Sequence, residues 1–373
     1  MEDGKKRFMT AVSVLVGSAI GAGGLGIPYV AARTGFFAAV AYIVLIGLII
    51  LAVNLYFGEV ILRTNGKHQI AGYGRKYLGK KGWLALEFAV IFGIYSAIVA
   101  YMLGIGESLS HLIFGDSGSS FVLGIAFGLG MSGLLWRGLR ALKKFEKMGV
   151  FLILTLLLLI VIFFFKDVNF SNLYFFNSAN VFLPFGIVLF AMMSFYAIPQ
   201  VSIVLHNNQK IMKKVLVTGT FISMAFYILF TLVVVGVNGV NTPEIATLGL
   251  GKIFIFLGIL TMFTSYLTLG NALQENFMYD ERFRKYKAWI FASLVPIGIF
   301  IFVKLVGFFS FVNILSLGGL VSGGLIAILI LLMIKKAKKE GNRKPEYSLP
   351  ASWFIIGFLS LIFIFGLLAQ LLR

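Results

Sequence analysis

One stretch near the N-terminus indicates the fold of this chain, Val16-Gly17-Ser18-Ala19-Ile20-Gly21-Ala22-Gly23-Gly24-Leu25-Gly26-Ile27-Pro28-Tyr29. It puts five glycines and a proline in the middle of an otherwise apolar segment, so a helix here is expected to break. In hydrocarbon, a broken helix is tolerated only where its freed backbone groups line a cavity or bind something. Breaks near the bilayer midplane are typical of transporter substrate sites.

The same letters also fit a nucleotide-binding fingerprint, because residues 21–26 match G-x-G-x-x-G. That motif needs a preceding strand and a carboxylate about 20 residues further on. The segment before it reads as a membrane span rather than a strand, and the next acidic residue is Glu59. The pattern therefore favours the broken helix.

Composition indicates an all-α polytopic membrane protein. Of the 373 residues, 60% are hydrophobic and only 12% are charged, against roughly 25% charged in soluble domains. With about 20 apolar residues per span, we predict eleven transmembrane helices, at residues 8–32, 35–62, 82–113, 119–136, 147–165, 180–205, 211–238, 253–279, 287–303, 306–333 and 351–372.

The net charge of +18 could suggest a nucleic-acid partner, but the basic residues fall in alternate loops between the predicted spans. With the N-terminus in the cytoplasm, 27 of the 32 lysines and arginines fall in cytoplasmic segments, as the positive-inside rule requires. This predicts a cell (plasma) membrane protein with its C-terminus outside. The chain has no cysteine, which excludes disulfides and thiolate chemistry.

Residues 1–373 are expected to form one transmembrane domain built from an inverted 5+5 repeat, residues 8–166 and 180–333, with an eleventh helix at 351–372. Each half opens with a proline-containing span. We expect Pro28 and Pro199 to free the carbonyls of Gly24 and Phe195, and Ile198 to leave helical angles. The alternative is that both prolines only kink structural helices, but breaks in matching positions favour a binding site.

These residues resemble the amino acid/auxin permease family. The resemblance lies in residues 17–29 with Gly35-Phe36, and in Phe195-Tyr196-Ala197-Ile198-Pro199-Gln200 followed by residues 209–214, which is similar to the bacterial aromatic amino acid permease branch. The expected loop at residues 72–79 and the segment at 314–319 fit as well. Prokaryotic relatives of sodium-coupled neutral amino acid transporters are also similar. The resemblance covers nearly the whole chain.

The resemblance implies the leucine-transporter-like fold of the amino acid–polyamine–organocation superfamily, with broken helices 1 and 6. It also implies symport of amino acids by alternating access, with the site between spans 1, 3, 6, 8 and 10. A half-helix that starts at about Ala22 or Gly23 would point its N–H groups at the substrate carboxylate. Glycine, including Gly24, lets a ligand approach the backbone closely.

For the substrate ammonium, the family pattern implies the carbonyl of Ala19 and those of Phe190, Met193 or Ser194 in span 6. If Met193, Phe195 and Tyr196 line the pocket, they favour a bulky apolar or aromatic side chain; core packing is the alternative. Tyr101 resembles a family tyrosine on the substrate face, and the alternative for it is an interfacial role.

A coupling ion is suggested by span 8, where Thr261, Thr264 and Ser265 share one helix face at i, i+3 and i+4. With the backbone carbonyls of Gly17 and Ile20 they would make a five-oxygen cage that resembles the family sodium site. Hydroxyl groups that bond their own helix are the alternative. Sodium is modestly favoured over a proton.

A proton-coupled permease would use a titratable group, and four carboxylates lie in or near spans: Glu59, Glu87, Glu107 and Glu275. Burying a carboxylate in a membrane is costly, which makes each a functional candidate. The last three fall close to predicted helix ends, and Glu59 resembles a family carboxylate that ties helices together. We therefore predict a structural role for Glu59.

The remaining alternatives are an amino acid sensor that does not transport, whose pocket would look the same, and a membrane-embedded enzyme. An enzyme is disfavoured because His68, His111 and His206 are far apart and no H-E-x-x-H motif is present. No cofactor besides the ion is expected. The expected partners are an amino acid and the lipid bilayer, with the chain acting as a monomer.

Overall fold

The computed structural model describes residues 2–66, 68–137, 155, 158–206, 208–279 and 283–371. Within these ranges every regular element is helical. The α-helices are α1 (Glu2–Ala19), α2 (Ile27–Thr34), α3 (Phe36–Leu62), α4 (Ile70–Ile113), α5 (Ser120–Arg137), α7 (Pro184–Met192), α8 (Ile198–Leu205), α9 (Met212–Asn238), α10 (Lys252–Tyr279), α11 (Lys285–Trp289), α12 (Val295–Val306), α13 (Phe311–Gly318), α14 (Gly324–Glu340) and α15 (Trp353–Leu371).

Short 3₁₀ and π turns join several of these helices. The 3₁₀ turns are η1 (Ala22–Gly26), η2 (Phe165–Asp167), η3 (Phe170–Leu173), η4 (Ser178–Asn180), η5 (Phe195–Ala197), η6 (Gln209–Ile211), η7 (Gly239–Asn241) and η8 (Ala246–Leu250). The π turns are η9 (Ile290–Leu294) and η10 (Gly319–Gly323), which continue into α12 and α14. Tight and wide turns of this kind often mark places where a helix is adapted for function.

The described residues contain nine or ten candidate membrane spans. Nine helical segments are long and apolar enough to cross a bilayer, and the pair Gly4–Ala19 and Gly23–Thr34, bent by 48°, makes a tenth. Most predicted span boundaries agree to within a few residues. The predicted fifth span, residues 147–165, lies largely outside the described residues, although 158–164 are helical.

Both predicted broken helices are present. In the first, α1 ends at Ala19, and η1 and α2 begin after Gly21, whose backbone is extended (φ −105°, ψ −166°). In the second, α7 ends at Met192, and Met193 takes extended angles before η5 and α8. The division into repeats 8–166 and 180–333 stays a prediction, but each half opens with a broken helix.

The two prolines act differently from our expectation. Each lies in the first turn of the second half-helix, α2 or α8, where a missing N–H costs nothing. Ile198 keeps helical angles (φ −63°, ψ −39°), and its N–H bonds to the Phe195 carbonyl, as the Ile27 N–H bonds to that of Gly24. The predicted freeing of those carbonyls is therefore wrong, because a 3₁₀ turn precedes each proline and satisfies them.

The predicted loop at residues 72–79 is wrong as well, since α4 already begins at Ile70. A positive φ of 70° at Gly79 kinks the helix there, a conformation that glycine adopts without strain. The arm before the kink is held by Tyr73 and Tyr77, which are buried, Tyr73 packing on Phe57 with ring centroids 5.6 Å apart.

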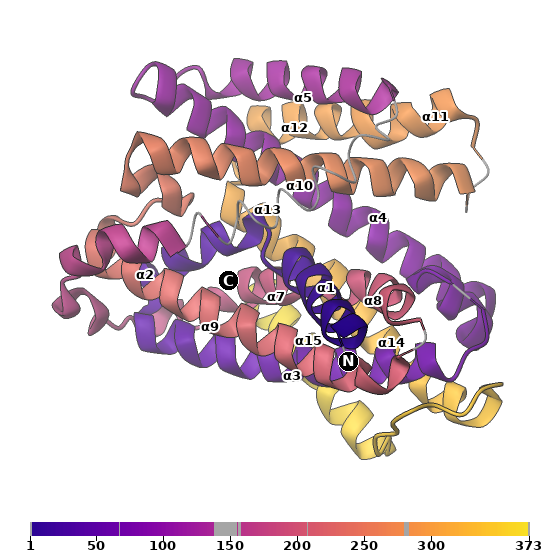
Figure 1. Ribbon diagram of the computed structural model, residues 1–373. Helices are drawn as coiled ribbons and strands as arrows, with labels where there is room; N and C mark the ends of the chain where they lie inside the picture. Colours follow the sequence, from indigo (N-terminus) through magenta and orange to yellow (C-terminus); the bar gives the residue numbers. More distant parts are fainter. Residues whose placement is uncertain are drawn as a thin grey trace.

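The helices form two groups joined by α4 (Figure 1). Figure 1 shows α5, α10 and α12 side by side in one group and α3 and α9 side by side in the other. Helix α4 packs against α5 and α10 as well as α13 and α14. The broken helices pack in the second group, with α7 against η1, α3 and α13 and α1 against α8 and α9, and η1 also contacts α10 of the first group.

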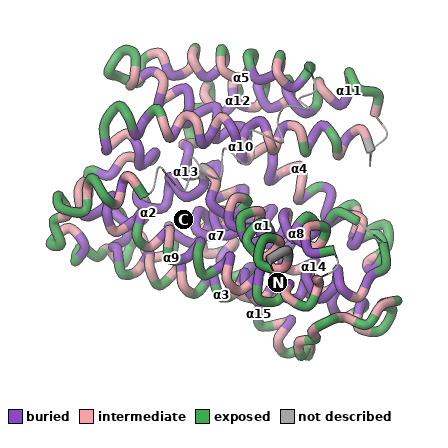
Figure 2. The backbone as a smooth tube through the Cα atoms, in the orientation of Figure 1, coloured by how far each residue is buried: buried purple, intermediate pink, exposed green. Residues whose placement is uncertain are grey.

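Many residues of the outer helices are exposed (Figure 2), and large apolar side chains are among them. On α15 the exposed side chains include Trp353, Phe354, Phe358, Leu361 and Phe365. A soluble protein rarely exposes apolar surface on this scale, so the outer surface is suited to lipid.

Glu59 ties α3 to the connector between α14 and α15, residues 341–352, which we call the strap. Its carboxylate is fully buried and pairs with Arg63 (2.8 Å) and Lys338 (2.9 Å). It also accepts hydrogen bonds from the Ser348 hydroxyl (3.0 Å) and the Leu349 N–H (2.7 Å). These contacts agree with the predicted structural role.

Candidate functional site

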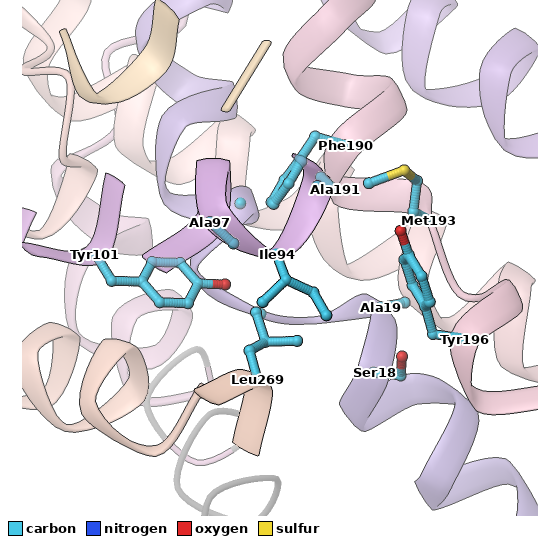
Figure 3. A pocket seen from close by; sticks show the side chains of 13 residues that line it. Ser18, Ala19, Ile94, Ala97, Tyr101, Phe190, Ala191, Met193, Tyr196 and Leu269 are labelled. Carbon is cyan, nitrogen blue, oxygen red and sulfur yellow. The ribbon is translucent and has the colours of Figure 1, made fainter. Parts of the chain in front are cut away.

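A cavity of about 100 Å³ lies between the two breaks (Figure 3). It is bounded by both broken helices, by α4 and by α10. The lining residues are Ser18, Ala19, Gly21, Gly23, Gly93, Ile94, Ala97, Tyr101, Phe190, Ala191, Met193, Tyr196 and Leu269. None of them carries a charge, so this cavity suits a ligand whose charges are met by backbone groups.

Five of the nine predicted substrate residues line this cavity: Ala19, Gly23, Tyr101, Phe190 and Met193. Figure 3 shows the rings of Tyr101, Phe190 and Tyr196 around it, each from a different element. The other four, Ala22, Gly24, Ser194 and Phe195, are not among the lining residues.

The contacts of the non-lining residues explain their positions. Gly24 faces α9, because a Cβ there would lie 2.4 Å from Cε1 of Tyr227. The Ser194 hydroxyl turns to α3, where it accepts a hydrogen bond of 2.8 Å from the Asn54 amide. Phe195 is fully buried beside Tyr196, and Ala22 is the first residue of η1.

Sequence reasoning missed the α4 wall although a signal for it existed. Gly93, Ala97 and Tyr101 are spaced i, i+4 and i+8, so they lie on one helix face. Extending this period back from Tyr101 would have found Gly93 and Ala97. Ser18, Gly21, Ala191 and Leu269 carry no comparable pattern.

Two glycines let the cavity walls approach each other. A Cβ on Gly23 would lie 2.8 Å from Cδ1 of Phe190, so the Phe190 ring can rest on the first break only because residue 23 is glycine. A Cβ on Gly93 would lie 2.4 Å from the Ser322 hydroxyl. That hydroxyl is 3.0 Å from the Tyr196 hydroxyl, and the pair fixes the tyrosine at the wall.

The carbonyl of Ala19 is already occupied. It accepts hydrogen bonds from the Tyr227 hydroxyl (2.6 Å) and the Gly21 N–H (2.9 Å). A carbonyl oxygen has two lone pairs, so Ala19 accepts no ammonium in this arrangement. Tyr227 was not among the predicted site residues.

The predicted ion ligands are distributed over the first break and α10. Thr261 and Thr264 are buried, and their hydroxyls donate to the carbonyls of Gly258 (2.8 Å) and Thr261 (3.0 Å) on their own helix. Ser265 hydrogen-bonds Tyr101. These bonds match the structural alternative, but a hydroxyl that donates keeps its oxygen lone pairs.

The break also changes the hydrogen bonds at the two backbone carbonyls predicted to bind the ion, those of Gly17 and Ile20. In a continuous helix the N–H of Gly21 would bond to Gly17 and that of Gly24 to Ile20. Here the Gly21 N–H bonds to Ala19 and the Gly24 N–H to Gly21 (3.2 Å). The carbonyls of Gly17 and Ile20 therefore lose their helical partners, and the cage of Gly17, Ile20, Thr261, Thr264 and Ser265 stays a prediction.

The connector between α9 and α10 covers the first break at η1. Its turn η8 packs against η1, α9 and α10, and Ile245, Ala246 and Thr247 are fully buried. The Glu244 carboxylate accepts a hydrogen bond of 3.3 Å from the Val312 N–H at the start of α13. Ser18, at the other side of the cavity, is exposed.

Curated relatives of this chain are transporters. It is 26% identical over 227 residues to Tyrosine-specific transport system 1 of Haemophilus influenzae, covering 59% of this chain and 55% of that protein. It is 24% identical over 241 residues to Glutamine transporter 2 of Aliivibrio fischeri, covering 62% of this chain and 61% of that protein. The matches thus span less than two thirds of the length of these relatives.

Among solved structures, the chain resembles MhsT in complex with L-phenylalanine, with a TM-score of 0.68 and 14% sequence identity. The likeness covers 96% of this chain and 98% of that one, which shows a shared leucine-transporter-like fold. Homologues and fold are those of membrane transporters rather than enzymes. Residues 4–249, more than half of the chain, match the family model, and the chain therefore belongs to the tryptophan/tyrosine permease family.

Proposed function

We propose that this protein is a secondary active transporter that imports neutral amino acids with bulky apolar or aromatic side chains, by ion-coupled symport and alternating access. Sodium is favoured over a proton as the coupling ion. The protein acts as a monomer in the plasma membrane, with its N-terminus in the cytoplasm and its C-terminus outside.

The observation that carries this proposal is the uncharged cavity between two broken helices. A zwitterionic amino acid brings one positive and one negative charge, and half-helix ends can meet both without a charged side chain. A lysine, arginine or glutamate substrate would bury an extra charge against Tyr101, Phe190 and Met193. The absence of a countercharge among the lining residues therefore supports a neutral substrate.

Substrate size is constrained by the volume of about 100 Å³. A cavity of about 150 Å³ is known to hold benzene, so an aromatic side chain needs additional room. Met193 is the side chain suited to move, because methionine is unbranched and adaptable. A small amino acid would fit without that movement, so competition between alanine and phenylalanine tests the size class.

The substrate orientation follows from the two breaks. The first N–H groups of η1 have no partners within the turn, and the turn continues into α2, so we place the carboxylate beside Gly23. The ammonium then lies toward the carbonyls of Phe190 or Met193, since that of Ala19 is occupied. The side chain points toward Tyr101 and Tyr196.

The present conformation is closed on the side of η8 and exposed at Ser18. With the predicted topology, this corresponds to a transporter closed to the outside. Residues 241–247, between α9 and α10, include the buried Ile245, Ala246 and Thr247, which supports a role for this segment as an outer lid.

Uptake into proteoliposomes tests the proposal, with labelled phenylalanine, tyrosine, glutamine and alanine under a sodium or a proton gradient. We expect accumulation of a bulky neutral amino acid driven by sodium. Accumulation driven only by protons would replace the ion and keep the site. Binding without uptake under either gradient would contradict transport and favour a sensor.

A further inference from the structure

One tyrosine reaches both breaks. The hydroxyl of Tyr227 on α9 lies 2.6 Å from the carbonyl oxygen of Ala19 and 3.1 Å from that of Ala191. Ala19 is the last residue of α1, and Ala191 lies in the last turn of α7. The side chain is fully buried. Because carbonyls only accept, the hydroxyl is the donor in this arrangement, with its single proton shared between two acceptors.

The position of this hydroxyl is one that favours positive charge. The last carbonyls of a helix have no partner within it, and the C-terminal end of a helix carries the negative end of its dipole. Two such ends, from α1 and α7, meet at the Tyr227 hydroxyl. In transporters with broken helices, carbonyls at half-helix ends of this kind coordinate cations. Here a neutral proton donor lies at that point instead.

The first break contains a residue that makes room for the tyrosine. A Cβ on Gly24 would lie 2.4 Å from Cε1 and 3.1 Å from Cδ1 of the Tyr227 ring. Any larger residue at position 24 would displace the ring. Gly24 therefore gives the Tyr227 ring its room, although it does not line the cavity.

We propose that Tyr227 is a positioning residue of the transport site. Its hydroxyl replaces a bound monovalent cation between the two breaks and holds their carbonyl ends together. The inference rests on the proposed function in that it assigns this role to the transport site. Removing the hydroxyl should leave two convergent carbonyls that sodium or potassium can bind.

Hydrogen exchange of the purified full-length protein tests this, with Tyr227→Phe compared with Tyr266→Phe. Tyr266 is a matched control, because it is fully buried on α10 and its hydroxyl has no hydrogen-bond partner within the described part of the chain. The readout is the second break, residues 192–197, because the predicted α10 ion site takes no atom from it. Choline chloride is compared with sodium chloride and potassium chloride.

In choline, Tyr227→Phe should exchange about tenfold faster than the parent protein at the second break, as the loss of a buried hydrogen bond predicts. Sodium or potassium should restore the protection, and Tyr266→Phe should match the parent. Gly24→Ala, which displaces the ring but keeps the hydroxyl, is expected to loosen the same segment. It provides the test if Tyr227→Phe does not fold.

Unchanged exchange in Tyr227→Phe, or equal loosening in Tyr266→Phe, would overturn the proposal. Fast exchange in Tyr227→Phe that neither sodium nor potassium slows would also overturn it. The Tyr227 hydroxyl would then only hydrogen-bond the two breaks and would not take the place of a cation. Uptake is measured on the same preparations. If the variants show these exchange effects but the parent protein transports no amino acid, the proposed function is contradicted and the role of Tyr227 between the two breaks stands.

Discussion

The space between Gly23 in the first break and the Phe190 ring is too small for a methyl group. Gly23→Ala would place a Cβ 2.8 Å from the Phe190 ring and 3.3 Å from Cα of Ala191. Relief of such overlap typically costs about 1–3 kcal/mol, and here it would shift the cavity wall. We expect the apparent affinity for substrate to fall by about tenfold, measured as the concentration for half-maximal uptake.

Gly21→Ala is the control at the same break. Its Cβ would meet the nearest atoms at 3.9 Å, and φ of −105° suits any residue. Because Gly21 lines the cavity, the added methyl group takes up some room there but does not push the Phe190 ring, so the affinity loss should be smaller than that of Gly23→Ala. Equal losses in both variants would show that the effect is not the contact with Phe190.

Thr264 and Thr268 allow the predicted ion site to be tested by hydroxyl removal. Both hydroxyls donate to carbonyls of their own helix at 3.0 Å, but only Thr264 belongs to the predicted cage. Thr264→Ala should raise the sodium concentration for half-maximal uptake about tenfold, the effect of losing one buried ligand to a charged group. Thr268→Ala should leave it unchanged. A similar sodium requirement in both variants would remove α10 from the ion site.

At the scale of elements, Glu59 is the buried charge that joins α3, α14 and the strap. Glu59→Gln leaves the positive charges of Arg63 and Lys338 without their countercharge. Breaking a buried pair in this way costs about 3–5 kcal/mol, so we expect a lower midpoint of thermal unfolding. Because the side chains of Arg63 and Lys338 are partly exposed, we expect the loss of stability to lie near the lower end of this range.

Glu346→Gln is the matched change on the strap, because Glu346 pairs with Arg343 at a partly exposed position. Its effect on unfolding should stay within about 1 kcal/mol. If Glu59→Gln were instead as stable as the parent but made uptake independent of pH, Glu59 would be a proton carrier.

The strap should also keep its contacts over a wide pH range. Burial, with a smaller contribution from the Glu59 carboxylate, raises the pKa of the Tyr347 phenol well above its usual range. The neutral phenol donates to the Leu55 carbonyl at 2.7 Å. Its contribution is therefore complete below the usual tyrosine pKa of about 10 and is lost as pH rises above it.

We expect the difference in unfolding midpoint between the parent and Tyr347→Phe to be constant from about pH 5 to about pH 9. Thermal unfolding at several pH values measures it. A difference that shrinks between pH 7 and pH 9 would show that the phenol ionises while the strap is folded.

The second break shows why element boundaries were only partly predictable. The first break could be predicted from five glycines between Gly17 and Gly26. Met192 and Met193 give no sign of a break, since methionine has a high helix propensity. At the α7–α8 break, Asn54 donates a hydrogen bond to the Ser194 hydroxyl and Tyr227 donates one to the Ala191 carbonyl. Both partners come from other helices, so the local sequence does not predict these contacts.

For the whole molecule, the absence of cysteine makes the predicted topology directly testable. Ser117→Cys and Lys339→Cys place single thiols at exposed positions on opposite predicted sides. In intact cells, a membrane-impermeant maleimide should label residue 117 and not residue 339, which should react only after permeabilisation. The reverse pattern would invert the orientation inferred from the charged loops.

The sequence predicted the global architecture well because hydropathy and charge are properties of whole spans. The nine or ten candidate spans within the described ranges agree with this pattern. The site was predicted less completely, because its walls are set by packing between distant segments. Tyr101 was found through family resemblance, whereas Tyr227 has a role only once α9 lies beside both breaks.

The uncharged cavity has a consequence for how substrate preference can change. In the proposed orientation, the carboxylate and ammonium are recognised by peptide groups, which are the same in every sequence that keeps the breaks. The side chain of the substrate meets replaceable residues such as Met193 and Tyr196. Mutation can then alter which amino acid is accepted without disturbing the recognition of amino acids as a class, so new preferences are reachable by single substitutions.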